Sequence, residues 1–193
     1  KVKTTFVCNN CGSNFPKWQG QCTSCKSWNT ISEEVVLQPK NNTWETKGVK
    51  NIKSSTPQKI SNIVYKEEDR LVTSDTEFNR VLGGGVVPGS LILLGGEPGI
   101  GKSTLLLQIA IRLPYSTLYV SGEESQSQIK MRANRMDHES DDCYVLTEIS
   151  LEGIFKQIEK TKPQILIIDS IQTLKTELVD SAPGSVSQIK TCT

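Results

Sequence analysis

The sequence has little of what an inserted or exported protein needs. None of the apolar runs among its 193 residues approaches the roughly 18 residues of a membrane-spanning helix. The opening segment, Lys1 to Phe6, also lacks the apolar stretch of a secretory signal. Histidine is nearly absent, because His138 is the only one, so a Ser-His-Asp or Cys-His centre would depend on this residue alone. We therefore expect a cytoplasmic protein without a membrane anchor, and we expect His138 on the surface in a polar stretch.

The composition is that of a globular protein, but its charge is unevenly distributed. Hydrophobic residues make up 36% of the chain and charged residues 22%, which excludes collagen-like and disordered compositions. The net charge of +1 conceals nine lysines against three glutamates in residues 1–60 and an excess of acidic residues after them. A basic N-terminal part suits contact with phosphate backbones, although scattered lysines in a flexible segment are more often simply solvated.

The chain divides by texture into a cysteine-rich module at 1–31, a flexible polar linker at 32–59 and a larger core at 60–193. In the core, short apolar runs alternate with helical patterns, which predicts an α/β fold whose parallel sheet has helices on both faces. The expected strands are 91–94, 117–121, 143–146 and 165–168, and the expected helices are 103–113, 124–136 and 151–158.

Four of the six cysteines form two Cys-x-x-Cys pairs separated by ten residues: Cys8, Cys11, Cys22 and Cys25. Two thiolate pairs at this spacing suit tetrahedral Zn²⁺, and so short a segment needs a metal to supply its folding free energy. Disulfides and a redox dithiol are the weaker alternatives. Four sulfur ligands leave no open position, so the predicted zinc is structural. Cys143 and Cys192 stand apart and are expected to be ordinary packed residues.

A motif of the form G-x-x-x-x-G-K-S follows the first expected strand of the core and opens the next helix. It comprises Gly96, Glu97, Pro98, Gly99, Ile100, Gly101, Lys102 and Ser103, with Thr104 next in the helix. The backbone N–H groups of such a loop surround an anion, Lys102 reaches the β- and γ-phosphates of ATP, and the Ser103 hydroxyl binds Mg²⁺. A merely structural glycine turn would not explain Lys102 and Ser103 in this register.

Three carboxylates follow strands of the predicted sheet. Asp169 ends the apolar run 165–168 and is the expected second Mg²⁺ anchor, although an Asp there could also be a turn or cap residue. Glu123 and Glu124 follow the strand 117–121, at the edge where open parallel sheets bind ligands. We expect Glu123 to be the catalytic carboxylate, because Glu124 is the more natural residue for a first helical turn. The alternative is that both glutamates merely stabilise the following helix, through the favourable interaction of negative charge with the helix N-terminus.

Together these motifs resemble the bacterial RadA (Sms) DNA-repair ATPases, which are relatives of RecA. The matching segments are 8–29, 82–90, the phosphate loop, 120–125, 168–173 and 183–188. The resemblance implies a RecA-like P-loop NTPase core behind a zinc-ribbon-like module, with ATP, Mg²⁺ and Zn²⁺ as cofactors. It also implies a homo-oligomeric ring that acts as a DNA-stimulated ATPase on single-stranded DNA and promotes branch migration of recombination intermediates. RecA recombinase or a replication protein is the expected partner of the zinc module.

The sequence departs from this family in length and in its missing motifs. Family members are more than twice as long and carry a Lys-Asn-Arg-Phe-Gly motif and a Lon-protease-like domain, so the chain looks like an N-terminal fragment. A later strand of the RecA-like sheet normally separates the phosphate-loop strand from the Asp169 strand, so we expect a gap there. The alternatives are a KaiC-like nucleotide switch without DNA remodelling and a zinc module that is itself the DNA reader.

The segment after Asp169 is the expected link between ATP and DNA. We expect Gln172 to sense the γ-phosphate and the polar loop 175–183 to face DNA in the ring's channel. A solvated surface loop is the alternative, because Lys175 is offset by Glu177 and Asp180.

Overall fold

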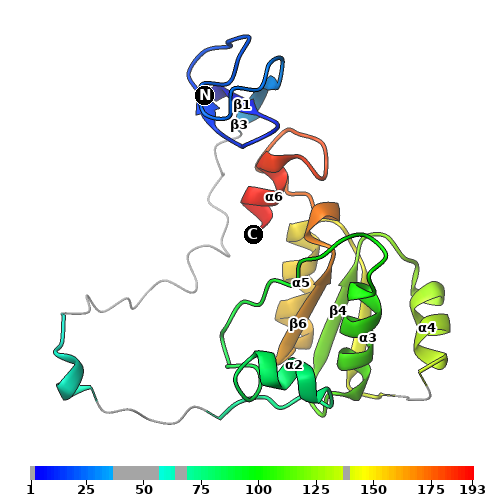
Figure 1. Cartoon of the computed structure of the whole chain (residues 1–193). Coiled ribbons are helices and arrows are strands. Elements are labelled where there is room, and N and C mark those ends of the chain that lie inside the picture. Colours follow the sequence, from blue (N-terminus) through cyan, green and yellow to red (C-terminus); the bar gives the residue numbers. More distant parts are fainter. Residues whose placement is uncertain (1–2, 37–56, 64–68, 137–139) are drawn as a thin grey trace.

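The computed structural model describes residues 3–36, 57–63, 69–136 and 140–193. Most of the linker predicted at 32–59 lies outside the described residues, as does His138. The described residues contain an antiparallel sheet of order β2-β1-β3 near the start of the chain and a parallel sheet of order β5-β4-β6 in the core. The predicted α/β class is therefore confirmed (Figure 1).

The N-terminal module is built on β1 (Lys3–Cys8), which pairs with β2 (Asn14–Phe15) and β3 (Ile31–Val36). Cys8, Cys22 and Ile31 are buried at its centre, and the aromatic rings of Phe6 and Phe15 pack against them. The predicted module boundary at residue 31 falls at the start of β3, whose pairing with β1 continues to Val36. The strand therefore extends into the segment that composition alone assigned to the linker.

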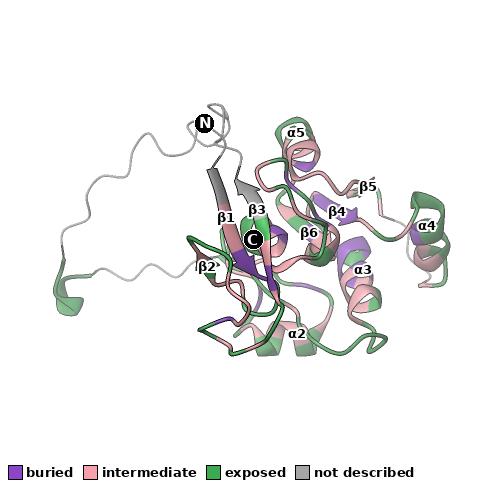
Figure 2. Ribbon diagram, turned by 90° about the horizontal axis from the view of Figure 1, so that it is seen from above, coloured by how far each residue is buried: buried purple, intermediate pink, exposed green. Residues whose placement is uncertain are grey.

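The parallel sheet has β4 (Thr117–Ser121) between β5 (Cys143–Thr147) and β6 (Ile165–Asp169), as the apolar runs predict. Every residue of β4 is buried, and the strand is purple in Figure 2. Ser121 is in register with both Thr147 and Asp169. The carboxyl ends of all three strands therefore meet at one edge of the sheet.

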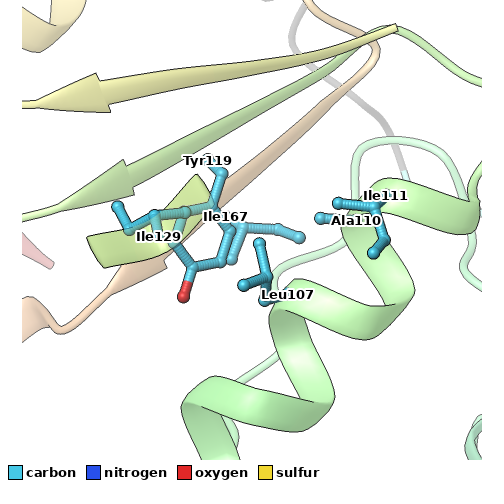
Figure 3. Close-up of a cluster of buried hydrophobic side chains, with 6 residues drawn as sticks. All are labelled: Leu107, Ala110, Ile111, Tyr119, Ile129 and Ile167. Carbon is cyan, nitrogen blue, oxygen red and sulfur yellow. The ribbon is translucent and has the colours of Figure 1, made fainter. Parts of the chain in front are cut away.

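Helices cover both faces of this sheet, because alternate residues of β4 point to opposite sides. Tyr119 packs with Leu107 of α3 (Lys102–Arg112) and Ile129 of α4 (Gln126–Asn134) on one face (Figure 3). Leu118 packs with Ile154 of α5 (Leu151–Thr161) on the other face. The remaining helical elements are α2 (Thr76–Val81), α6 (Val186–Cys192) and short 3₁₀ turns at Ile60–Asn62 and Ile171–Thr173. None of the described helices combines the length and apolar character needed to cross a bilayer.

The prediction of a strand at 91–94 is wrong. That segment forms no strand within the described part of the chain, and its Leu91 and Leu93 side chains are 84% and 86% exposed. A strand needs a neighbour to satisfy its backbone groups, and the described parallel sheet ends at β6. The gap was expected between a strand at 91–94 and the strand that ends in Asp169; because the first of these is not formed among the described residues, the gap stays a prediction.

Candidate nucleotide site and cysteine cluster

The cysteine cluster has the dimensions of a tetrahedral metal site. The sulfur atoms of all its four members lie within 4.8 Å of one another: Cys8, Cys11, Cys22 and Cys25. The Cys8 and Cys25 sulfurs are 3.7 Å apart, and those of Cys11 and Cys22 are 3.5 Å apart. Sulfurs held about 2.3 Å from one ion at the corners of a tetrahedron lie about 3.8 Å apart. The four thiols therefore fit Zn²⁺.

Two similar turns of the backbone bring the cysteines together. The N–H of Gly12 donates to the Cys8 carbonyl at 2.7 Å, and the N–H of Lys26 donates to the Cys22 carbonyl at 2.8 Å. Gly12 and Lys26 each follow the second cysteine of a pair and have φ values of 71° and 61°. This left-handed conformation folds each pair back under the metal position.

The polar surroundings of two of these thiols favour the thiolate, which is the form that binds metal. Hydrogen bonds from Ser27 and then Asn10 lower the pKa of Cys25 to about 5. A hydrogen bond with Thr30 likewise lowers the pKa of Cys8. The pKa of Cys22, in contrast, is raised to about 11. Cys143 lies outside this cluster and packs against the hydrophobic core around Tyr119, as predicted, and burial raises the pKa of its thiol to about 11.

The phosphate loop lies immediately before α3, and Lys102 is the first residue of that helix. The Lys102 ammonium lies within the curve of the loop and donates to the carbonyl oxygens of Gly96 at 2.7 Å and Glu97 at 2.8 Å. Gly99 and Gly101 have φ values of 79° and 100°, which side chains rarely allow, so the two glycines make the curve possible. The loop thus places a fixed cation and a helix N-terminus at one point, where an anion is favoured.

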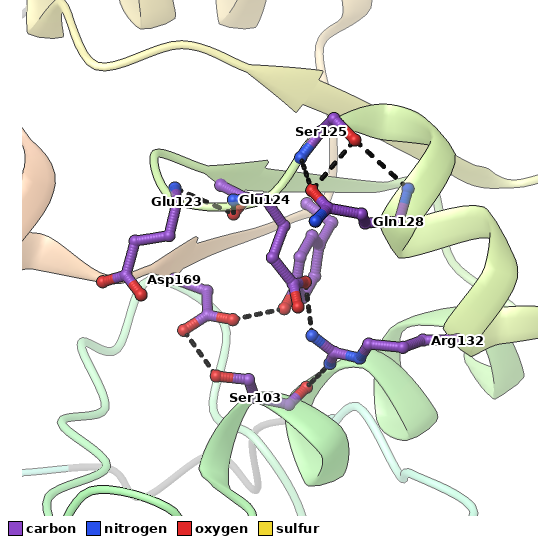
Figure 4. A network of polar contacts seen from close by, with 9 residues as sticks. Ser103, Glu123, Glu124, Ser125, Gln128, Arg132 and Asp169 are labelled. Atoms are coloured by element: carbon purple, nitrogen blue, oxygen red, sulfur yellow. Dashed lines mark hydrogen bonds and ion pairs between the residues drawn. The ribbon is translucent and has the colours of Figure 1, made fainter.

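Asp169, at the end of β6, joins the phosphate loop to the sheet. Its Oδ1 accepts a hydrogen bond of 2.9 Å from the Ser103 hydroxyl, across 66 residues of sequence (Figure 4). Both oxygens predicted to hold Mg²⁺ are therefore brought together. A carboxylate and a hydroxyl are the hard oxygen ligands that this ion prefers, so the residues present fit it.

A residue that the sequence analysis missed supports the other side of this carboxylate. The Tyr119 hydroxyl donates to Oδ2 of Asp169 at 2.6 Å. Burial raises the pKa of Tyr119 well above its ordinary value, and the bond to Asp169 raises it further, so the hydroxyl stays a donor. The one available signal was a phenolic hydroxyl between the apolar residues Leu118 and Val120.

The two glutamates after β4 have different surroundings. Both backbone N–H groups donate to the Ser121 hydroxyl, at 3.4 Å for Glu123 and 3.2 Å for Glu124. The Glu123 carboxylate accepts a hydrogen bond of 3.3 Å from Ser170, the residue after Asp169. The Glu124 carboxylate instead forms an ion pair with Arg132.

The sequence suggested that Glu124 lies in the first turn of a helix, but in the structure it precedes the helix. The helix α4 begins at Gln126, and its N-terminus is capped by the Ser125 side chain. Arg132 also donates to the Ser103 carbonyl at 2.8 Å, so the Glu124–Arg132 pair ties α4 to the first turn of α3. No local pattern predicts this contact, which depends on how the two helices pack.

A hollow of about 280 Å³ opens at the carboxyl end of β4 and β5. Its lining comprises Ser121, Gly122, Glu123, Glu124, Ser125, Thr147, Glu148 and Ile149. Gly122 permits the close packing beside it, because a Cβ there would lie 2.1 Å from the Thr173 hydroxyl oxygen. Open parallel sheets bind ligands at this edge, so Glu123 and Glu124 lie where they could contact a bound substrate.

The loop after β6 is held by its own anchors rather than simply solvated. The side chain of Gln188, 2% exposed, accepts from the Thr176 N–H at 2.9 Å and donates to the Val179 carbonyl at 2.8 Å. The Thr176 hydroxyl donates to Glu152 of α5 at 2.5 Å. Gln172 is exposed, and within the described residues its side chain joins none of the contacts around Asp169. The structure therefore does not bring Gln172 into the site.

The fold and the site define a P-loop nucleotide-binding domain preceded by a zinc ribbon. The AAA domain family matches residues 56–187, and the rubredoxin metal binding domain family matches residues 6–33. Because the first match spans more than half of the chain, the chain belongs to the AAA domain family.

The chain is also similar along its length to proteins named DNA repair protein RadA. It is 48% identical to that of Halalkalibacterium halodurans and 46% identical to that of Bacillus subtilis, covering 100% of the chain and 43% of each relative. The Haemophilus influenzae protein is 45% identical over 98% of the chain and 42% of its own length. The resemblance to the RadA family is therefore confirmed, and the chain spans less than half the length of these relatives.

Proposed function

We propose that the chain supplies the ATP-binding and zinc-binding parts of a DNA-stimulated ATPase for DNA repair and recombination. The observation that supports this proposal is the hydrogen bond of 2.9 Å between Ser103 and Asp169, because it joins two oxygen-bearing side chains that suit Mg²⁺ beside the phosphate loop. The relatives' name, DNA repair protein RadA, supports the process. The proposed organisation is a zinc module whose predicted end at residue 31 moves to the end of β3 at Val36, a linker from there to residue 59 and part of a RecA-like core at 60–193.

The site residues divide the work of hydrolysis among them. Residues Gly96 to Thr104 hold the phosphates through backbone N–H groups, and Lys102 lies close to their negative charge. Ser103 and Asp169 would hold Mg²⁺, which when bound neutralises charge on the β- and γ-phosphates. Glu123 orients the attacking water and accepts its proton.

Glu123 is preferred to Glu124 as this base because of their partners. The carboxylate of Glu124 is committed to Arg132 in a partly buried ion pair, so taking a proton would cost that pair. Among the described residues, Glu123 has only the Ser170 hydroxyl as a side-chain partner of its carboxylate, and this bond orients the carboxylate without neutralising it.

The finer parts of the proposal concern the assembled protein. We expect a homo-oligomeric ring that binds single-stranded DNA and drives branch migration of recombination intermediates, with RecA recombinase or a replication protein on the zinc module. The exposed Leu91 and Leu93 support a larger assembly of elements, since apolar side chains at 84% and 86% exposure are normally covered in the complete fold.

The decisive experiment measures ATP turnover of the full-length protein with and without single-stranded DNA. We expect turnover that rises with DNA and is abolished by Lys102→Ala, with Lys160→Ala, an exposed lysine of α5, as the matched control. Turnover in the Lys102→Ala protein at the normal rate would refute the phosphate-loop assignment. Turnover indifferent to DNA would favour a KaiC-like nucleotide switch.

A further inference from the structure

Two tryptophans of the N-terminal module are on its surface rather than in its centre. Trp18 is 59% exposed and Trp28 is 69% exposed, whereas Phe6 and Phe15 pack against the buried cysteines. Large aromatic side chains add most to the stability of so small a module when they are buried. Their exposure on a metal-stabilised scaffold therefore indicates a surface that meets another molecule.

The two rings gather around Gly20. A Cβ at that position would lie 3.8 Å from Cη2 of Trp18 and 3.8 Å from Cζ3 of Trp28, so both rings border the space that the glycine leaves open. The backbone fixes this arrangement. The N–H of Asn29 donates to the Gly20 carbonyl at 2.8 Å, and Gln21 and Trp28 form an isolated antiparallel β-bridge. The rings form one exposed aromatic surface.

The charge around this surface favours a polyanion. The acidic residues of the module, Glu33 and Glu34, lie on β3, whereas Lys17 and Lys26, close in sequence to the two tryptophans, are both exposed. The negative charge of the thiolates would be partly neutralised by the metal that they hold. A purely apolar partner would have no use for the lysines, whereas nucleic acid uses both groups.

We propose that Trp18 and Trp28 form a stacking platform for unpaired bases of single-stranded nucleic acid, with Lys17 and Lys26 beside the phosphates. Every base has an aromatic face, so such a platform binds without sequence preference. This inference rests on the DNA-binding part of the proposed function and adds a contact that is separate from the ATPase core.

The test is a double-mutant cycle, in which tryptophans are removed from the protein and bases are removed from the oligonucleotide. The zinc-loaded 193-residue chain is titrated, without nucleotide, into a labelled thymidine oligomer of about 12 nucleotides, within the usual range of site sizes. A second titration uses an abasic oligomer of the same length. Replacing both tryptophans with Ala should weaken binding to the thymidine oligomer by about tenfold or more and leave binding to the abasic oligomer unchanged.

Conservative replacements separate stacking from general apolar contact. The double Trp→Phe variant, which keeps two aromatic faces, should retain most of the affinity for the thymidine oligomer, and the double Trp→Leu variant should lose it. Zinc content, measured for every variant, checks that the module stays folded, as expected for exposed positions.

Three results would overturn the platform: unchanged affinity for thymidine in the Ala variant, equal losses on both oligomers, or Leu performing as well as Phe. The last would assign the surface to a protein partner. A wild-type chain that binds neither oligomer would instead overturn the DNA-binding part of the proposed function, and the platform with it.

Discussion

The hydroxyl of Tyr119, on the middle strand β4, and the carboxylate of Asp169, at the carboxyl end of β6, are joined by a hydrogen bond of 2.6 Å. Tyr119 is 0% exposed, and its hydroxyl holds Oδ2 of Asp169 while Oδ1 accepts from Ser103. A carboxylate fixed on both oxygens has little freedom to rotate. The direction in which Asp169 would meet a metal ion is therefore set in part by a buried residue outside the phosphate-loop motif.

The first prediction is that Tyr119→Phe weakens the effect of Mg²⁺ on nucleotide binding. Phe keeps the packing of the ring against Leu107 and Ile129 but removes the donor to Asp169. In titrations with a fluorescent ADP analogue, affinity with Mg²⁺ should fall severalfold while affinity without Mg²⁺ stays the same. Tyr144→Phe on β5, whose side chain is 48% exposed, is the matched control. An unchanged Mg²⁺ effect in Tyr119→Phe would show that Ser103 alone orients the carboxylate.

The second prediction separates the two glutamates after β4. Glu123→Gln should bind ATP normally but lose turnover, because the base is gone while the fold is intact. Glu124→Gln should retain turnover better and lose stability, because it leaves Arg132 without its counterion. The loss should be roughly 1–3 kcal/mol, less than for a fully buried pair, since the side chains are 19% and 30% exposed.

Urea unfolding and ATP turnover, measured on both variants, distinguish these roles. Arg132→Met provides a further check, because it should lower stability like Glu124→Gln and also remove the contact with the Ser103 carbonyl. The opposite result, with turnover abolished only in Glu124→Gln, would reverse the assignment of the base.

The third prediction is that the chain carries one zinc ion, released by acid. Each thiolate that takes up a proton stops being a ligand, so zinc affinity falls as the pH is lowered. The pKa of Cys25 is lowered to about 5, whereas that of Cys22 is raised to about 11, so the four ligands share no single titration point and release should increase progressively as the pH falls. Elemental analysis after dialysis at a series of pH values measures this, and absence of zinc in protein prepared at neutral pH without chelator would contradict it.

A cysteine variant tests whether the module and the core fold independently. Cys8→Ser should unfold the zinc module and spare nucleotide binding, since Cys8 is buried in a cluster formed by residues of the module. Loss of nucleotide binding in this variant would show that the module supports the core.

The sequence predicts those features that local patterns determine. The strands at 117–121 and 165–168 were recognisable because continuous apolar runs are typical of buried parallel strands. The phosphate loop needed only its own eight residues. The failure at 91–94 is instructive, because the same apolar pattern gives no strand where no neighbouring strand pairs with it. Strand formation depends on a partner that the local pattern does not contain.

The missed residues fail to show in the sequence for a related reason. Tyrosine is a common residue in buried strands, so Tyr119 does not stand out in the sequence. Only the folded structure shows that its hydroxyl donates to the Asp169 carboxylate. Arg132 lies on a helix with many polar neighbours and meets Ser103 only because α4 packs beside α3. Both contacts depend on the register between elements, which local periodicity does not specify.

The last prediction concerns how DNA reaches the nucleotide. Gln172 is exposed three residues after Asp169, while the loop beyond it is fastened by Gln188. If Gln172 senses the γ-phosphate in the assembled protein, Gln172→Ala should hydrolyse ATP slowly, lose stimulation by single-stranded DNA and keep its stability. Gln188→Leu should lose both stability and stimulation by DNA. The free energy of unfolding should fall by roughly 2–4 kcal/mol, because the carbonyl groups that Gln188 bonds lose their donor. Thermal unfolding and DNA-dependent turnover, measured in parallel, separate a signalling contact from a structural anchor. Undiminished stimulation in Gln172→Ala would refute the coupling and leave the ATPase assignment intact.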